Sequence, residues 1–321
     1  MEYTCASFFA GVGGIDLGFE NEGFKVIYAN EIDEFAVQTY EKNSSIKVDN
    51  RDIRDVKVEE LPNFDILLAG FPCQAFSIAG YREGFNDKKG RGNLFFELER
   101  IFEIKKPKVI FLENVKNFLN HDNGKTFEKI YNSLTKNGYH VEKKVCNSSE
   151  YGNIPQNRER IYIIAFLDEK AKEHFKFPNP IPLTKKFKSY INNRKPIDKK
   201  YYYTKENCYF YEELASMVKR RDTAYQWRRK YVRENKSNLC PTLTANMGTG
   251  GHNVPIVLDS YGIRKITPKE CFAFQGYPKD FELANLSNTR LYKQAGNSVV
   301  VPVIERFAYQ IKTALDTLEE E

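Results

Sequence analysis

One stretch near the N-terminus decides the fold class: residues 4–14, which read TCASFFAGVGG. Residues 4–9 are predicted to form a strand, and the three glycines after them predict a tight turn before a helix over about residues 15–21. A strand, a glycine turn and a helix in this order open a nucleotide-binding α/β unit. The stretch therefore predicts an α/β fold of the Rossmann type, although a glycine turn of this kind also occurs without a ligand.

The residues after this turn indicate which nucleotide would bind. A dinucleotide fingerprint wants a third glycine at position 16, where the chain has Asp16, and a carboxylate at a helix start would repel a pyrophosphate. Glu31 follows the predicted strand 24–29 and can accept hydrogen bonds from both ribose hydroxyls, whereas Asp33 is expected to cap the next helix. Asp52, at another predicted strand end, is placed to reach an adenine amino group. These features favour adenosine without phosphates over NAD.

A cysteine follows the next predicted strand. Residues 64–77 read FDILLAGFPCQAFS, and residues 64–69 predict a short buried strand that ends just before Cys73. Parallel α/β sheets place their chemistry at this end of a strand, and Pro72 stiffens the backbone there. A lone cysteine is more often a buried small hydrophobe. The polar, glycine-rich segment 74–93 is long enough to close over a site as a lid. A lid beside Cys73 favours the interpretation of this cysteine as a nucleophile.

Charged residues also flank two later strands. Glu113 follows the apolar strand 108–112, and partial burial there would raise the pKa of its carboxyl so that it could share a proton near neutral pH. An N-cap or a surface charge is an equally good interpretation of Glu113 alone. Arg158 and Arg160 enter the strand at 161–166, and strand alternation predicts that they share one face. Such an arginine pair favours a site with anionic or carbonyl partners.

The charge of the chain is concentrated in one segment. The net charge is +6 over 321 residues, but residues 183–236 hold 16 Lys or Arg and 6 Asp or Glu, so this segment carries +10 and the remainder −4. A basic segment on a slightly acidic protein suggests a polyanionic partner, although a charge run is more often only a solvated face. Aromatic residues interleave with arginines at residues 227–231, as is typical of nucleic-acid surfaces.

Composition shifts divide the chain into parts. Residues 178–261 are rich in proline, tyrosine and lysine without sustained alternation of strands and helices, which predicts a second, irregular domain. The amphipathic pattern over about residues 299–318 predicts a helix that returns to the first domain's sheet. The expected parts are residues 1–180, 181–285 and 286–321.

The spacing of the six cysteines bears on disulfides and metals. They are far apart and lack a C-x-x-C pair, which argues against disulfides and a structural metal site. The chain has no apolar run of membrane length and no basic-then-apolar N-terminal signal, so we expect a cytoplasmic protein.

Six stretches of the chain, taken in order, resemble the motif set of the cytosine-5 DNA methyltransferases, above all the compact bacterial enzymes of restriction-modification systems. The resemblance covers nearly the whole chain outside residues 180–260. It implies a Rossmann-like S-adenosylmethionine-dependent methyltransferase domain with a smaller, mostly irregular or β target-recognition domain. Position 273 departs from the motif because it holds Ala273 where the family has an arginine. The six stretches are residues 9–14, 72–74, 113–115, 156–160, 264–278 and 294–298.

The resemblance also implies the residues of the site, in three groups. The catalytic group is Cys73, Glu113, Arg158 and Arg160. The group that would hold S-adenosylmethionine is Phe9, Gly11, Gly13, Glu31, Asp52, Ile53, Pro72, Leu94, Asn297 and Ser298. The DNA-binding group is Gln74, Ser77, Gln226, Arg228, Arg229, Tyr231 and Thr242, with Thr242 at the phosphate of the target nucleotide. Arg228 and Arg229 are expected to approach base edges, and Lys185, Lys186, Lys199 and Lys200 to contact phosphates.

The activity that follows from the resemblance is methyl transfer to C5 of a flipped-out cytosine in a short site of double-stranded DNA. The sequences of residues 226–231 and 242–252 resemble those of family members that act on CC-containing palindromes. The implied setting is bacterial and nucleoid-associated, with a monomeric enzyme and a cognate restriction endonuclease as functional companion. A tRNA cytosine-5 methyltransferase of the same fold is the alternative, but the basic segment and Thr242 favour duplex DNA. A DNA-binding regulator without catalysis should lack Cys73, Glu113 or Arg160, and all three are present.

Overall fold

A computed structural model describes residues 2–72, 94–228, 230–249 and 253–321. The chain forms two compact units, here called the large and the small unit. The large unit comprises Met1–Cys146, Glu159–Asn179 and Val303–Glu321, and the small unit comprises Asn147–Arg158 and Pro180–Pro302. Residues 147–158 and 286–302 thus lie in the small unit, which differs from the boundaries expected from composition.

Helix packing explains why the chain returns to the large unit later than expected. Helix α9 (Asn288–Asn297) packs against α8 (Pro268–Phe274), and both lie in the small unit. The buried Gln275 side chain donates to the Ala295 carbonyl oxygen at 2.7 Å. This buried hydrogen bond fixes α9 to the small unit, so only the last helix, α10 (Val301–Glu320), carries the chain into the large unit.

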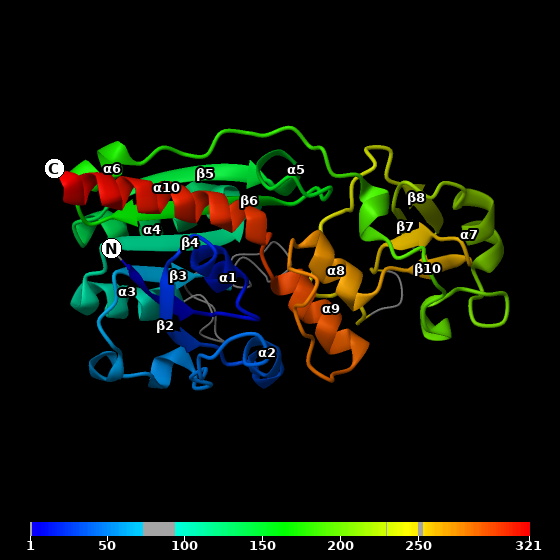
Figure 1. The fold of residues 1–321 in the computed structure, drawn as a ribbon, viewed down its shortest axis with the longest axis horizontal. Helices are drawn as coiled ribbons and strands as arrows, with labels where there is room; N and C mark the ends of the chain where they lie inside the picture. Colours follow the sequence, from blue (N-terminus) through cyan, green and yellow to red (C-terminus); the bar gives the residue numbers. More distant parts are fainter. Residues whose placement is uncertain (1, 73–93, 229, 250–252) are drawn as a thin grey trace. The chain divides into compact units, whose positions relative to one another are not determined.

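A six-stranded sheet forms the centre of the large unit, with the strand order β2-β1-β3-β4-β6-β5 (Figure 1). Strands β2, β1, β3 and β4 are parallel, whereas β6 runs antiparallel to β4. Such a mixed sheet with a parallel core is the arrangement that the N-terminal strand and glycine turn predict. The strands are β1 (Thr4–Phe8), β2 (Lys25–Asn30), β3 (Ile66–Ala69), β4 (Val109–Val115), β5 (His140–Asn147) and β6 (Glu159–Phe166).

The strand order contains a switch point between β1 and β3. From β1 the chain moves to β2 on one side, and it then returns to place β3 on the other side of β1. Ligands of open α/β sheets bind beyond the carboxyl ends of the strands at such a point. The glycine turn follows β1 directly and residues 70–72 follow β3, so both decisive stretches of sequence lie there.

Helices cover both faces of this sheet. On one face, Phe111 of β4 contacts Phe19 of α1 and Phe307 of α10, at ring-centroid distances of 5.2 and 6.0 Å. An ideal Cβ on Gly18 would lie 2.6 Å from Ile304, so glycine is needed for the close approach of α1 to α10. The neighbours of Phe111 on β4 point to the other face and pack in one buried cluster with α3 and α4. The helices of this unit include α1 (Gly14–Glu20), α2 (Glu34–Tyr40), α3 (Leu94–Lys105), α4 (Lys125–Lys136) and α6 (Glu169–His174).

The small unit contains a four-stranded sheet of order β10-β9-β7-β8, with antiparallel pairing. Trp227 of β7 is buried and stacks on Phe210 at a centroid distance of 4.7 Å, which anchors the core of this sheet. The sequence predicted a mostly irregular or β domain, and the sheet confirms the β part of that prediction. The remaining elements are α5 (Ser148–Tyr151), α7 (Tyr211–Met217), β7 (Tyr225–Arg228), β8 (Tyr231–Glu234), β9 (Ile256–Leu258) and β10 (Ile263–Lys265).

Two features are absent from the described ranges, a metal-binding cluster and a membrane-spanning helix. Across these ranges, no group of three or more His, Cys, Asp or Glu residues is arranged to hold a metal ion. No helix in the same ranges has the length and apolarity needed to cross a membrane. Five of the six cysteines lie there, all buried and with free thiols.

Candidate functional site

The turn after β1 has an unusual backbone. Phe9, Gly11 and Gly13 all have positive φ, at 55°, 59° and 82°. Glycine adopts this conformation without cost, but for phenylalanine it costs about 1–3 kcal/mol and persists only where the surroundings impose it. Strain of this kind gathers at ligand sites, and here it lies at the sheet's switch point.

Glu31 ties the turn to the end of β2. One oxygen of its carboxylate accepts from the Gly11 N–H at 2.8 Å, and the other accepts from the Asp33 N–H at 2.8 Å. Asp33 itself accepts from the Phe35 N–H and caps α2, as predicted. Glu31 therefore fixes two loops, the glycine turn and the start of the segment that leads into α2.

The structure corrects the environment predicted for Asp52. It does not end a strand but caps a single 3₁₀ turn, Ile53–Asp55, and it pairs with Arg54. The hydrogen bonds from Arg54 lower the pKa of the Asp52 carboxyl. Ile53 is buried in the core, and Leu94, the first residue of α3, is half-buried against it. Two of the predicted cofactor residues, Ile53 and Leu94, are thus hydrophobic side chains that pack in or against the core.

Glu113 and Arg160 form an ion pair in the large unit. Glu113 Oε1 lies 3.0 Å from Arg160 Nε, and the two side chains are only 11% and 13% exposed. The pair follows from the register of β4 and β6, which places Arg160 opposite Val115, two residues from Glu113.

The segment before Cys73 lies against this pair. An ideal Cβ on Gly70 would lie 3.6 Å from Glu113 Oε2, so the end of β3 passes directly beside the carboxylate. Asn114 donates to the Phe71 carbonyl oxygen at 3.1 Å and holds the next residue in place. Pro72 is half-buried. Cys73, Gln74, Ser77 and the predicted lid at 74–93 lie outside the described residues.

Arg158 does not share a face with Arg160, so that prediction is wrong. Strand β6 begins at Glu159, and alternation applies only within a strand. Arg158 is 3% exposed, and its guanidinium donates to the carbonyl oxygens of Leu243 at 2.7 Å, Gly296 at 3.0 Å and Ser298. These contacts point to a structural role within the small unit rather than to contact with a substrate.

Sequence reasoning missed two glutamines beside Arg158. Gln156 is fully buried and donates to the Phe274 carbonyl oxygen at 2.6 Å, and Gln275 donates to Ala295. The signal in the sequence is that Gln156 belongs to the 156–160 stretch and Gln275 to the 264–278 stretch. Together with Arg158 they tie residues 156–158 to α8, α9 and the segment after Thr242.

The two small-unit residues of the predicted cofactor set differ in exposure. Asn297, at the end of α9, is exposed, whereas Ser298 is buried and its hydroxyl lies 2.5 Å from the Tyr277 hydroxyl. An ideal Cβ on Gly296 would lie 2.1 Å from the carbonyl carbon of Thr244. Glycine is therefore required where α9 meets the backbone of residues 244–245.

The β7–β8 hairpin presents a polar face. Gln226 lies opposite Arg233 and Arg228 lies opposite Tyr231, so these four side chains share one face of the sheet. Arg228, Tyr231 and Arg233 are exposed, and the Gln226 amide oxygen accepts from Arg228 at 3.2 Å. Arg233 was missed by the sequence analysis, although the hairpin spacing could have indicated it. Arg229 lies outside the described residues.

Thr242 is exposed, as a phosphate contact would require. Its hydroxyl donates to the Asn157 carbonyl oxygen at 2.6 Å. A hydroxyl has one proton to donate, so the side chain would have to rotate before it could donate to a phosphate.

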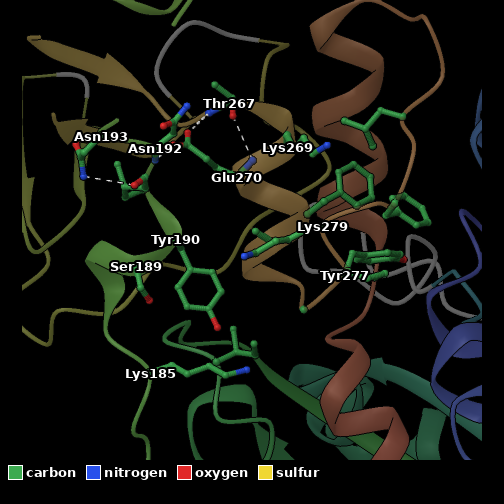
Figure 2. Close-up of a pocket in the computed structure, with 18 of the residues that line it drawn as sticks. Lys185, Ser189, Tyr190, Asn192, Asn193, Thr267, Lys269, Glu270, Tyr277 and Lys279 are labelled. Carbon is green, nitrogen blue, oxygen red and sulfur yellow. Dashed lines mark hydrogen bonds between the residues drawn. The ribbon is translucent and has the colours of Figure 1, made fainter. Parts of the chain in front are cut away.

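A cavity of about 850 Å³ lies within the small unit, between residues 185–197 and the segment 267–283 (Figure 2). Ala273 is part of its wall, at the position where the motif has an arginine. The charge of the nearby Glu270 is balanced without an arginine at position 273. Its carboxylate accepts from both terminal nitrogens of the buried Arg264, at 2.8 and 2.7 Å. The departure at Ala273 therefore lies in the small unit, whereas the pair Glu113–Arg160 belongs to the large unit.

Comparisons with known proteins agree with this geometry. A family model described as C-5 cytosine-specific DNA methylase matches residues 3–313. The type II methyltransferase M.Bsp6I of Bacillus sp. strain RFL6 is 59% identical over 307 residues, which cover 95% of this chain and 97% of that protein. The type II methyltransferase M.HaeII of Haemophilus aegyptius is 41% identical over 317 residues, covering 98% and 94%. The solved structure of the Entamoeba histolytica methyltransferase EhMeth has the same fold, with a TM-score of 0.74 at 22% identity over 99% of both chains.

The parallel-rich sheet and the strained glycine turn form an α/β fold that this chain shares with a solved methyltransferase structure. The chain belongs to the C-5 cytosine-specific DNA methylase family, and it is a DNA (cytosine-5-)-methyltransferase. The fold class, the family and the enzyme class predicted from the sequence are thereby confirmed.

Proposed function

We propose that this enzyme uses S-adenosylmethionine to methylate C5 of a flipped-out cytosine within a short, specific site of duplex DNA. The observation that carries the proposal is the buried pair Glu113–Arg160, which lies beside Gly70, three residues before Cys73. Fixed at the end of β3, Glu113 in its acid form can donate a proton to N3 of a cytosine ring, and the Arg160 guanidinium can donate to O2.

The residues after β1 and β2 fit an adenosine-type cofactor. Glu31 lies beside the turn that Phe9 and Gly11 form, and its carboxylate is the group proposed to bind the ribose. Pro72, Leu94 and Ile53 are the apolar residues proposed for the cofactor site of the large unit. When bound, S-adenosylmethionine supplies the electrophilic methyl group that C5 attacks.

In the proposed reaction, the Cys73 thiolate adds to C6 of the cytosine and makes C5 nucleophilic. Glu113 binds or protonates N3, and Arg160 holds O2, so that both draw charge from the ring as the C6–S bond forms. After methyl transfer, a base removes the C5 proton and the electron pair of that C–H bond restores the C5–C6 double bond, which expels Cys73 as thiolate. The base must leave the helix for this chemistry, at a cost of a few kcal/mol.

A role in restriction and modification is part of the proposal. Two relatives, at 59% and 41% identity, are named type II methyltransferases. The matched region spans nearly the full length of this chain and of both relatives. Methylation of one sequence would protect it from a cognate endonuclease acting at the same site. A cytoplasmic, nucleoid-associated enzyme fits this role.

The substrate class is tested by incubating the protein with radiolabelled S-adenosylmethionine and either plasmid DNA or total tRNA. We expect label in the DNA only, and bisulfite sequencing should place all 5-methylcytosine in one short sequence. Label in tRNA with none in duplex DNA would overturn the proposal in favour of the tRNA alternative. No label in either would exclude both.

Sequence reading is proposed for the polar face of the β7–β8 hairpin. We expect Arg228→Ala to remove about 1–3 kcal/mol of discrimination at one base pair, because an exposed arginine can bind guanine O6 and N7 as a fork. Lys199→Ala should instead weaken binding to every sequence and lower the salt slope by about one. Competition binding with cognate and singly substituted duplexes at several salt concentrations separates the two effects. A uniform loss of affinity in Arg228→Ala would make this arginine a backbone contact.

A further inference from the structure

A buried carboxylate, that of Asp16, supports the glycine turn. Its hydrogen bonds with Ser7 and Tyr40 are here called the brace. Asp16 lies in the first turn of α1 and is 2% exposed. One carboxylate oxygen accepts from the Ser7 hydroxyl of β1 at 2.5 Å, and the other accepts from the Tyr40 hydroxyl of α2 at 2.7 Å. The carboxylate therefore joins the strand before the turn and the helix that follows β2. The argument against NAD assumed that this carboxylate faces the ligand at the helix start. In the structure it is turned toward Ser7 and Tyr40 instead.

Tyr40 also touches the turn directly. An ideal Cβ on Gly13 would lie 2.9 Å from Tyr40 Cε2, so the tyrosine ring packs against this glycine. The ring is 2% exposed and belongs to the small apolar cluster between β2 and α2. Gly13 is the N-cap of α1 and has a φ of 82°. The position of the Tyr40 ring thus limits the conformations that the turn can adopt.

We propose that Tyr40, Asp16 and Ser7 are positioning residues that hold residues 9–13 in the conformation required to bind S-adenosylmethionine. The inference rests on the proposed function, in which Phe9, Gly11 and Gly13 form part of the cofactor site. None of the three is proposed to touch the cofactor. They act through the turn: Ser7 through the end of β1, Tyr40 through its ring on Gly13, and Asp16 through the hydrogen bonds that join them.

The protonation of Asp16 gives the brace a pH dependence. Burial raises the pKa of the Asp16 carboxyl to about 6, although hydrogen bonds from Ser7 and Tyr40 act in the opposite direction. Its titratable neighbours are Cys5, Glu20 and Tyr40; burial raises the pKa of each, that of Glu20 to about 7, and the charge of Asp16 acts in the same direction. Hydrogen bonds to the neutral acid are about half as strong as those to the carboxylate, so cofactor affinity should fall below about pH 6.

The effect on folding has the opposite sign. A carboxyl whose pKa is raised in the folded state stabilises the fold below its unfolded pKa, and this contribution is lost as the pH rises through about 6. Asp16 thus makes the fold less stable at high pH while it makes the brace stronger. A purely structural role would move stability and cofactor affinity in the same direction. A positioning role moves them apart.

The test measures the Kd of S-adenosylmethionine by calorimetry without DNA at pH 8, for the full chain and its variants. We expect Tyr40→Phe and Ser7→Ala each to raise this Kd about 5- to 30-fold, because a hydrogen bond to a charged group is lost. The matched control is Tyr139→Phe, which removes a buried hydroxyl that donates to the Pro107 carbonyl oxygen at 3.0 Å elsewhere in the large unit. The control should lose thermal stability but keep the wild-type Kd. DNA affinity should not change in any variant.

Asp16→Asn supplies the pH arm of the test. The wild-type Kd should rise about 3- to 10-fold between pH 7 and pH 5, whereas the Kd of Asp16→Asn should be raised at pH 7 and flat over this range. The proposal is overturned if Tyr40→Phe, Ser7→Ala and Asp16→Asn fold and bind the cofactor within twofold of the wild type. A wild-type protein that does not bind S-adenosylmethionine at all would instead refute the proposed function.

Discussion

Glu113→Gln is expected to lower the single-turnover rate of methyl transfer by about 10²- to 10⁴-fold. The glutamine amide cannot protonate N3 of the cytosine, and it cannot balance the charge of Arg160, from which Glu113 lies only 3.0 Å away. Glutamine has the same size and keeps a hydrogen-bonding group beside Gly70, so the fold and the cofactor affinity should be retained. The rate is measured by rapid quench with preformed enzyme–DNA complex and labelled cofactor.

The matched control for this variant is Glu159→Gln. Glu159 is the first residue of β6 and pairs with Lys116 at 2.8 Å, but its side chain is 43% exposed. A surface ion pair of this kind contributes about 0–1 kcal/mol, so the control should keep the wild-type rate. A Glu113→Gln rate within threefold of the wild type would show that Glu113 is structural and would remove it from the mechanism.

Arg158→Ala should destabilise the small unit by about 3–5 kcal/mol. The change leaves three buried carbonyl oxygens, of Leu243, Gly296 and Ser298, without the guanidinium that now binds them. Arg158→Lys should recover only part of this loss, because an ammonium cannot span three acceptors as a planar guanidinium does. Urea unfolding, followed by the fluorescence of the single Trp227 in the small unit, measures the loss.

Arg228→Ala is the control for Arg158→Ala, since Arg228 is exposed and its change should alter stability by less than about 0.5 kcal/mol. If Arg158→Ala kept wild-type stability but lost methyl transfer, Arg158 would belong to the catalytic group, as the sequence first suggested.

The glycine turn after β1 could be predicted from local sequence rules. The glycines, the acidic residue after β2 and the Asp33 cap each follow from short sequence patterns with a direct physical cause. The pairing of Glu113 with Arg160 could not be predicted, because these residues are 47 positions apart and meet only through the antiparallel register between β4 and β6. Alternation within a strand was a poor guide to Arg158, which lies one residue before β6.

The role of Asp16 shows a different limit of sequence reasoning. Its position at a helix start indicates a charge facing a ligand, but the carboxylate turns toward Ser7 and Tyr40. Tyr40 is 24 residues away and reaches Asp16 only because β2 and α2 return it to β1. The late return of the chain at Val303 has the same kind of cause, the packing of α9 on α8. Contacts between distant segments decide both features.

The central claim is that Cys73 forms a bond to C6 of cytosine, and covalent trapping tests it most directly. Duplex DNA with 5-fluorocytosine at the methylated position cannot lose its C5 substituent as a proton, so the enzyme and S-adenosylmethionine should yield a stable protein–DNA adduct. Peptide mass mapping should place the adduct on Cys73, and Cys73→Ser should bind the same DNA without forming it. An adduct on another residue, or methyl transfer by Cys73→Ser at the wild-type rate, would contradict the account.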